Sequence, residues 1–411
     1  MEVHPRQPEQ IQATAGFRRV FLGSLWVGGG CLLVAMLVGY LMDPTFGRFF
    51  HSYLVSFSFF LSISLGAIFF VLVQHVTRAG WSVGARRMAE TLGAVMPMLT
   101  ALAAPIVLSV VLQNGSLYPW ATHGPAGGEG HDLGAFKHAW FNPFFFFLRL
   151  AIYFGTWSLM GFWYWRESVK QDTSGDTSLT GQMQRFAPAA LLIYAMTLTF
   201  GTMDLLMSLD VHWFSTMFGI YYFSGCAVAI FASLIVILVL LQSRGYVTAT
   251  ITTEHFHDLG KFLFAFTFFW GYIAFSQYML LWYANIPEET NWYVVRGAST
   301  VKPNGYSPVI IILLFGHLLI PFVGVMSRHV KRRRKLLAFW AVWMLVFHWL
   351  DLYWLIMPAL DGQFHLGLID VLCFAGVGGI YLSTAMRIAM QHQLRPIADP
   401  RLAESLVFEN M

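Results

Sequence analysis

Residues 307–357 contain two long apolar runs separated by a short basic block. The runs are SPVIIILLFGHLLIPFVGVMS (307–327) and LLAFWAVWMLVFHWLDLYWLIM (336–357), and the block between them is RHVKRRRK (328–335). A transmembrane helix needs about 20 mostly apolar residues, so each run is long enough to span a bilayer. A basic block between two spans is typical of a cytoplasmic loop. This stretch therefore predicts two transmembrane helices joined on the cytoplasmic side.

The rest of the chain repeats this pattern of long apolar runs and short polar loops. Of its 411 residues, 57% are hydrophobic and 11% are charged, and the mean hydropathy is +0.60. Such values exclude an ordinary soluble domain. We predict an all-α polytopic membrane protein with ten transmembrane helices, at residues 18–40, 51–75, 91–113, 143–165, 185–209, 213–242, 258–284, 307–327, 336–357 and 366–388.

The 25 lysines and arginines are distributed unevenly between the two sides of the predicted helices. Twenty would lie on one side and 4 on the other, and Arg149 would lie within a span. Because cytoplasmic loops carry such an excess, we predict a multi-pass protein of the bacterial inner membrane with both termini cytoplasmic. The basic residues are thereby explained by topology and contact with lipid headgroups, and they give no indication of nucleic-acid binding.

Cysteine usage limits the redox chemistry expected of the chain. Cys31, Cys226 and Cys373 all fall within predicted spans, and the sequence contains no CxxC or CxxCH motif. Iron–sulfur clusters and covalently attached c-type haem depend on such cysteine patterns. We therefore expect this chain to hold no metal, no iron–sulfur cluster and no covalently attached haem.

Four short matches between the halves of the chain indicate an internal repeat. Gln74 and Gln242, Gly93 and Gly260, Pro143 and Pro308, and Asp204 and Asp351 recur in order, at offsets of 168, 167, 165 and 147 residues. The last offset is shorter because the predicted loop at 166–185 is longer than the one at 328–335. Parallel repeats of this kind occur in transport proteins. We predict the following organisation: a cytoplasmic tail (1–17), a flanking span (18–50), two tandem four-helix bundles (51–210 and 211–358), a second flanking span (359–390) and a cytoplasmic tail (391–411).

Polar and ionisable side chains inside spans are costly and are therefore candidates for function. Nine lie in the outer half of the predicted spans or near the midplane: Arg149, Asp204, Ser208, Asp210, His212, Gln277, His317, His348 and Asp351. A second group lies at the cytoplasmic ends and would form an entrance: Gln74, His75, His255, His257, Asp258 and Lys261, together with Glu90 and Glu254.

Three interpretations of these polar residues compete. Carboxylates and histidines at staggered depths are suited to a proton relay, because histidine changes its charge near physiological pH. An aspartate–histidine pair beside aromatic rings could instead bind a quinol headgroup. The structural alternative is an ion pair between Arg149 and an aspartate, with interhelical hydrogen bonds that help the helices to pack.

Histidines suggest two further sites that the sequence favours less. His317 and His348 lie near the midplane of adjacent spans and could hold a b-type haem, but a diheme cytochrome would need a second such pair, and none is evident. His123, His131 and His138 lie in or near the glycine-rich stretch 124–134 and could bind a metal. The composition of that stretch is more typical of an extracytoplasmic loop.

Three strings resemble a known family of membrane proteins. MSLDVHWFSTMFG (207–219) resembles a loop of the membrane subunits of alternative complex III. LGAIFFVLVQHVTRAGWS (65–82) and HFHDLGKFLFAFTFFWGYIAFSQYMLLWYANIPEET (255–290) are similar to signatures of one of the two related membrane subunits of that complex. The chain is thereby identified, over about residues 50–370, as resembling the NrfD/PsrC-like integral membrane proteins.

The resemblance implies one of two related membrane subunits in a respiratory or photosynthetic quinol:electron-acceptor oxidoreductase. The implied partners are a sister NrfD-like subunit, multihaem cytochrome c subunits and a periplasmic iron–sulfur subunit of the molybdopterin-enzyme type, which would supply the haems and clusters. The chain would then be a structural subunit with a proton path and no redox cofactor of its own. One alternative is a subunit that itself binds quinol or menaquinol and hosts its oxidation. A second alternative is a stand-alone secondary transporter.

Overall fold

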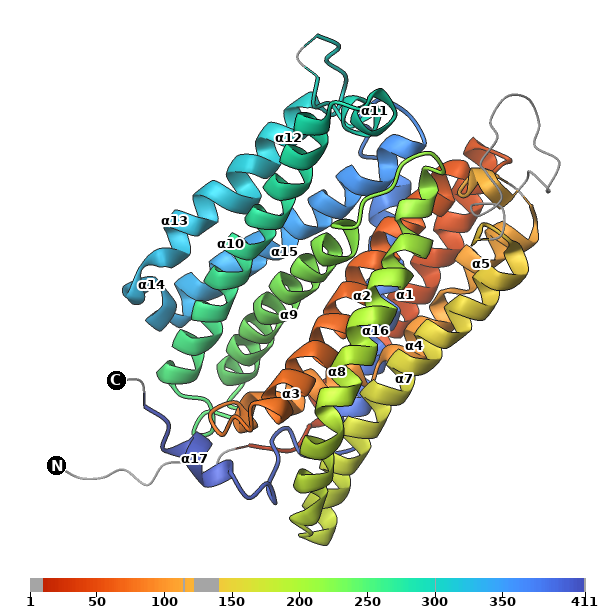
Figure 1. Cartoon of the computed structure of the whole chain (residues 1–411). Coiled ribbons are helices and arrows are strands. Elements are labelled where there is room, and N and C mark those ends of the chain that lie inside the picture. The colour runs from red at the N-terminus through yellow and green to blue at the C-terminus, as the bar shows by residue number, and fades with distance from the viewer. Residues whose placement is uncertain (1–9, 114, 122–139, 300, 410–411) are drawn as a thin grey trace.

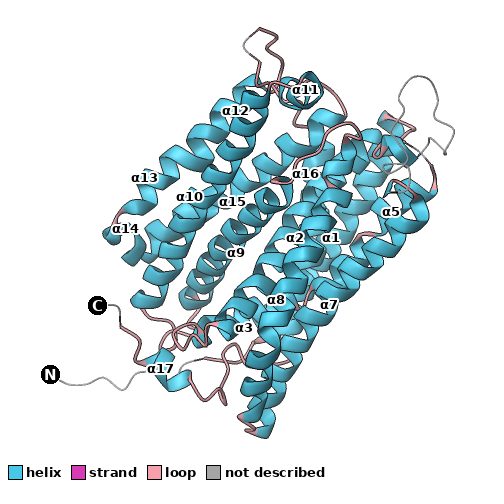
Figure 2. Cartoon of the chain, viewed as in Figure 1, coloured by secondary structure: helices cyan, strands magenta, loops and turns pink. Residues whose placement is uncertain are grey.

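The computed structural model describes residues 10–113, 115–121, 140–299 and 301–409. These residues are helical almost throughout, and within them the only β-type pairings are two isolated bridges (Figure 2). Ten helices or helical runs are long and apolar enough to cross a membrane. The predicted fold class, an all-α protein with ten such helices, is confirmed. The histidines at 123, 131 and 138 lie outside the described residues.

The transmembrane helices of the first half begin with α1 (Ala15–Met42) and α2 (Gly47–Val76). They continue with α3 (Val83–Gly93), α4 (Met96–Leu102), α5 (Ala104–Val111), α7 (Pro143–Ser174) and α8 (Ser178–Leu205), with short 3₁₀ turns η1 (Pro119–Ala121) and η2 (Met207–Leu209).

The second half contains α9 (Phe218–Ser243), α10 (Thr253–Ala284), α11 (Pro287–Val295), α12 (Ser307–Leu313), the π-helical turn η3 (Leu314–Leu319), α13 (Ile320–Met326), α14 (Arg328–Arg332), α15 (Arg334–Ile356), the 3₁₀ turn η4 (Met357–Ala359), α16 (Leu368–Ala389) and α17 (Leu402–Leu406).

Helices α2 and α9 form the centre of the molecule. Both are buried over most of their length, and they pack against each other. Helices α3, α4, α7 and α8 pack around α2. Helices α10 and α15 pack on α9, and α13 packs on α10 and α15 (Figure 1). Each group forms a four-span bundle, with α3 to α5 acting together as one span and α12, η3 and α13 as another.

The first and last spans pack against each other at one side of the bundles. Helix α1 is largely exposed and contacts mainly α16, which in turn packs on α2. Their crossing depends on small residues, because a Cβ atom added at Gly28 would lie 2.7 Å from the backbone nitrogen of Ile380. Such close backbone approach is a common way of packing helices in membranes.

The prediction of a loop at residues 166–185 is wrong. Helix α7 continues to Ser174 and α8 begins at Ser178, so only three residues separate them. The polar ends of the two helices are held together by the Gln171 amide, which donates to the Thr180 hydroxyl at 2.8 Å. Hydropathy detects only the apolar part of a helix, so a polar extension beyond it was missed. The helical hairpin projects beyond the neighbouring helices in Figure 1.

Two spans are interrupted where the sequence predicted continuous helices. The third begins at Val83, eight residues before its predicted start, and is divided into α3, α4 and α5. A proline stands in the first turn of both α4 and α5. In the eighth span Pro321 follows the π-helical turn, and its ring nitrogen cannot donate to the carbonyl of His317. The prolines thus explain breaks that a hydropathy window does not detect.

The described N- and C-terminal segments lie at the same end of the helices. The backbone N–H of Val247 donates to the Gln10 carbonyl at 3.2 Å, and that of Leu394 donates to the Ile11 carbonyl at 2.7 Å. The C-terminal segment then crosses towards α3, where the Ser405 hydroxyl donates to the Trp81 carbonyl at 2.9 Å. The N-terminal segment therefore contacts the loop after α9 and the C-terminal segment, and the C-terminal segment also contacts α3 (Figure 1).

Candidate functional site

The two repeat-related aspartates lie in different electrostatic environments. Asp204, at the end of α8, is buried and accepts two hydrogen bonds from Arg149 on α7, from Nε at 2.7 Å and from Nη2 at 2.9 Å. It also accepts the Trp140 indole N–H at 3.0 Å and the Tyr153 hydroxyl at 2.9 Å. A bidentate arginine with two neutral donors satisfies this carboxylate. The ion pair anticipated by the structural interpretation is therefore present.

Asp351, on α15, has only uncharged donors. The Tyr221 hydroxyl donates to Oδ1 at 2.5 Å, and the Trp270 indole N–H donates to Oδ2 at 3.2 Å. In the described part of the chain, no arginine or lysine forms an ion pair with Asp351. Burying a carboxylate without a counter-ion is costly, so buried groups of this kind are strong candidates for function.

A cavity of about 480 Å³ adjoins Asp351. Aromatic side chains contributed by α9, α10, α11 and α15 form much of its wall: Tyr221, Trp270, Tyr278, Tyr293 and Trp354. Phe275 of α10 also lines it, and aliphatic residues of α12 and the π-helical turn form part of the remaining wall. An apolar cavity with one convergent polar group is the usual form of a small-molecule site. We call this cavity the Asp351 pocket.

The interrupted eighth span shapes the far wall of the Asp351 pocket. Leu314 and Leu318 of η3 line it, and a side chain at Gly271 on α10 would collide with Leu318. His317, on the same turn, faces Trp270 with ring centroids 3.9 Å apart. Both of its ring nitrogens are buried without a hydrogen-bond partner in the described structure. His317 therefore lies directly behind a ring that binds Asp351.

A short chain of hydrogen bonds connects the Asp351 pocket to the loop before α9. Tyr293 lines the pocket and accepts the Gln277 side-chain N–H at 3.3 Å. The Gln277 carbonyl accepts the Ser215 hydroxyl at 3.2 Å, and Ser215 is half-buried. This chain leads from the cavity to the end of the bundle opposite the chain termini. Of its members, only Gln277 was a candidate from the sequence.

A buried arginine outside the spans holds α11, which contributes Tyr293 to the wall of the Asp351 pocket. Arg296 follows α11 and stacks on Trp292 at 3.6 Å from the ring centroid. Its Nη2 donates to the Leu355 carbonyl at 2.9 Å, and its own carbonyl accepts the Trp354 indole N–H at 2.9 Å. Burial lowers the pKa of Arg296 to about 9. These bonds hold α11, which carries Tyr293, against the end of α15.

The other outer candidates do not assemble into one site. The Ser208 hydroxyl donates to the backbone carbonyl of Asp204 at 2.6 Å, away from its carboxylate. The Asp210 carboxylate accepts the backbone N–H of His212 at 3.0 Å, which forms a turn at the surface. His348 is three residues from Asp351 but bonds Ser62 on α2 at 2.9 Å. Asp351 lines the pocket and Gln277 bonds Tyr293 in its wall, whereas Asp204 pairs with Arg149 in the first bundle.

At the cytoplasmic end predicted from charge, the structure reveals a buried ionic network that sequence analysis missed. Glu90 lies between Arg86, at 3.2 Å, and Arg87, at 3.3 Å. Arg87 also pairs with Asp172 on α7 at 2.6 Å, and Arg86 pairs with Asp399 of the C-terminal segment. Both arginines fall between the predicted spans 51–75 and 91–113, although their spacing of three and four residues from Glu90 is that of one helix face.

The predicted entrance residues fall into two separate places. Gln74 and His75 end α2, where the Gln74 oxygen and both His75 ring nitrogens are buried without a partner in the described structure. His255 forms a capping box with Thr252 at the start of α10, and its Nε2 lies 3.1 Å from the Ser405 hydroxyl. The remaining three share the first turns of α10, where two of them form an ion pair: His257, Asp258 and Lys261.

His392, in the C-terminal segment, gives this end of the molecule a predictable acid sensitivity. Burial, followed by the nearby Arg87 cation, lowers the pKa of His392 to about 4. Below about pH 6.5 the unfolded chain takes up a proton that the folded chain does not. The free energy of unfolding should therefore fall as the pH drops from about 6.5 to about 4, by at most about 3 kcal/mol.

The variant His392→Gln should lose this part of the pH dependence. The measurement is the melting temperature of the purified protein in detergent between pH 4 and pH 8. His329→Gln, which changes an exposed histidine on α14, is the matched control and should behave like the unmodified chain. Identical pH profiles for His392→Gln and the unmodified chain would contradict the assignment.

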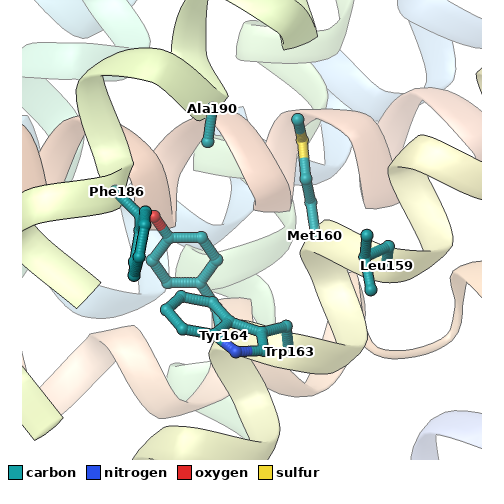
Figure 3. A pocket seen from close by; sticks show the side chains of 6 residues that line it. All are labelled: Leu159, Met160, Trp163, Tyr164, Phe186 and Ala190. Atoms are coloured by element: carbon teal, nitrogen blue, oxygen red, sulfur yellow. The ribbon is translucent and has the colours of Figure 1, made fainter. Parts of the chain in front are cut away.

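A second hollow lies on the outside of the first bundle, between α7 and α8. Its volume is about 290 Å³, and Figure 3 shows Trp163 and Tyr164 beside Phe186 in its wall. The Tyr164 hydroxyl already donates to the Met183 carbonyl at 3.2 Å. The wall of this hollow is thus formed by aromatic rings and aliphatic groups. The Asp351 pocket is the better candidate site, because it has a polar group that could orient a bound molecule.

Comparison with known proteins does not identify a family for this chain. No protein-family model matches it, and no curated protein sequence matches it. The class that the structure defines is therefore a ten-helix, multi-pass membrane protein with a buried carboxyl group in an aromatic pocket.

Proposed function

We propose that this chain is an integral membrane subunit of a quinol:electron-acceptor oxidoreductase of the alternative complex III type. The resemblance of residues 65–82, 207–219 and 255–290 to its membrane subunits supports the proposal. The uneven distribution of lysines and arginines supports a location in the bacterial inner membrane with cytoplasmic termini. Electrons would pass through haems and iron–sulfur clusters of partner subunits, and this chain would handle protons.

The observation that carries the proton-handling role is the uncharged environment of Asp351. Its carboxyl group is held by Tyr221 and Trp270 and has no ion-pair partner among the described residues. A proton can therefore be exchanged without breaking an ion pair, unlike at Asp204. The hydrogen bond between Gln277 and Tyr293 would be the next part of the proton path, which leads from the pocket towards the outer loop.

The membership of the complex is tested by purification through a tag on the C-terminus in mild detergent. Mass spectrometry should find a multihaem cytochrome c, an iron–sulfur protein and a second ten-span chain of the NrfD type. Recovery of a stable, monodisperse chain alone would overturn the proposal and favour a stand-alone transporter. A tag inserted at the exposed turn containing Gly175 provides a control for interference by the C-terminal tag.

A second candidate function is quinol binding by this chain, and the Asp351 pocket is the observation that favours it. The pocket offers about 480 Å³, aromatic walls and one carboxyl group. A quinol ring needs an apolar slot and a group that accepts its hydroxyl proton. In this second function Asp351 accepts that proton and Trp270 fixes the carboxyl group.

Photoaffinity labelling with an azidoquinone distinguishes the two functions. Labelling of α10 or α15 that is lost in Ala274→Phe, a substitution that fills the pocket, would support quinol binding. Labelling confined to the sister subunit would leave the proton path as the function of this chain. Ala227→Val, in the interior of α9, serves as a control for general effects of an added side chain.

A further inference from the structure

A long apolar slot runs along α16 and is separate from the Asp351 pocket. Its volume is about 440 Å³. On α16 the wall extends from Phe374 to Ala389, which is about 22 Å at 1.5 Å per residue. Phe17 on α1 and Leu394 of the C-terminal segment lie at the end near the termini, and α9 forms the opposite wall.

The dimensions of the slot match a single hydrocarbon chain. Its length of about 22 Å suits an extended hydrocarbon chain better than a compact ring. The length is close to the thickness of one leaflet with its headgroup region, since a whole bilayer is about 40–45 Å thick when the headgroups are included.

The chemistry of the wall also favours hydrocarbon. Three of its side chains are polar, and two of these are already engaged elsewhere. The Thr91 hydroxyl donates to the Arg87 carbonyl at 2.9 Å, and the Tyr381 hydroxyl lies 3.0 Å from the Ser64 hydroxyl. An ordered water needs two to four polar partners, so water is a poor occupant of this slot.

Three arginines lie next in sequence to residues that line the slot at its end near the termini. Arg18 and Arg19 directly follow Phe17, and Arg387 follows Met386, which also lines the slot. All three arginines are exposed, and the packing of α1 against α16 places the ends that carry them at the same level (Figure 1). Clustered basic residues at the membrane surface attract anionic headgroups.

We propose that the slot binds one acyl chain of an anionic phospholipid, whose phosphate lies against Arg18, Arg19 and Arg387. The lipid fills the space between α16 and the two bundles, so it adds a contact between the α1–α16 pair and the rest of the molecule. The binding site does not depend on the proposed oxidoreductase function.

The test is native mass spectrometry of the full chain after reconstitution in vesicles of equal parts phosphatidylethanolamine and phosphatidylglycerol. The unmodified chain should retain one phosphatidylglycerol. The slot-filling variant Ala375→Phe should lose it. The double variant Arg18→Gln/Arg387→Gln leaves the slot open and should lose the preference for phosphatidylglycerol by about tenfold.

The double variant Arg166→Gln/Arg328→Gln is the matched control, because it removes two exposed arginines elsewhere and should keep the preference. Retention of phosphatidylglycerol by both the slot-filling and the Arg18/Arg387 variants would overturn the proposal. A bound mass equal to a quinone would also overturn it. If Ala375→Phe does not fold, the amount of phosphatidylglycerol retained by the two arginine double variants tests the proposal, since these variants change only surface groups.

Discussion

Replacing Arg149 by leucine should destabilise the folded chain by about 3 kcal/mol, one of the largest effects expected of any single substitution. Arg149 supplies the positive charge that pairs with Asp204, and its removal leaves a buried carboxylate with two neutral donors. A buried ion pair contributes little net stability when intact, but breaking it leaves an uncompensated charge. The melting temperature of the purified protein in detergent measures the effect.

The double variant Arg149→Leu/Asp204→Leu separates charge from packing. It removes both charges, so most of the lost stability should return. Arg166→Leu, at an exposed position on the same helix, should melt like the unmodified chain. A single variant Arg149→Leu that melts normally would show that Asp204 does not need its counter-ion.

Unlike the replacement of Arg149, the replacement of Asp351 by asparagine should have a small effect on stability and a large effect on function. Asparagine has the same shape and can still accept one of the two hydrogen bonds from Tyr221 and Trp270, so the stability loss should be about 1 kcal/mol. Asparagine cannot exchange a proton. Under the proposed function, proton release per electron by the assembled complex should fall at least about tenfold.

Proton release per electron, measured in liposomes containing the assembled complex, is the appropriate readout. Asp361→Asn, at an exposed carboxylate in the loop after α15, is the matched control and should release protons normally. Normal turnover together with normal proton release in Asp351→Asn would exclude a proton path through the Asp351 pocket. Loss of turnover with loss of azidoquinone labelling would favour quinol binding instead.

These two expectations follow from an asymmetry that the repeat did not predict. The sequence placed Asp204 and Asp351 at matching positions, which suggested matching roles. The structure pairs Asp204 with Arg149 and leaves Asp351 beside a cavity. Arg149 and Tyr153 reach Asp204 from α7, whereas the donors to Asp351, Tyr221 and Trp270, come from α9 and α10. The two bundles therefore share an arrangement of helices but differ in their buried charge.

Candidate residues were recognised well where the signal was a polar side chain within an apolar run. Arg149, Asp204, Gln277 and Asp351 all proved to be buried or half-buried and engaged in interhelical bonds. Their partners were not recognised, because tyrosine and tryptophan are common in membrane helices and do not stand out. The burial of Arg86 could not be predicted from local sequence either, since its partner Asp399 lies more than 300 residues later.

The sequence by itself determined the number of spans and the all-helical class, because each span must satisfy its own backbone hydrogen bonds and requires a long apolar run. It also located the charged residues within those runs. Only the tertiary structure decided which of them are paired, where helices break, and where cavities remain. Those properties depend on contacts between distant segments, such as α2 with α9 or α15 with α9 and α10, and local hydropathy carries no information about them.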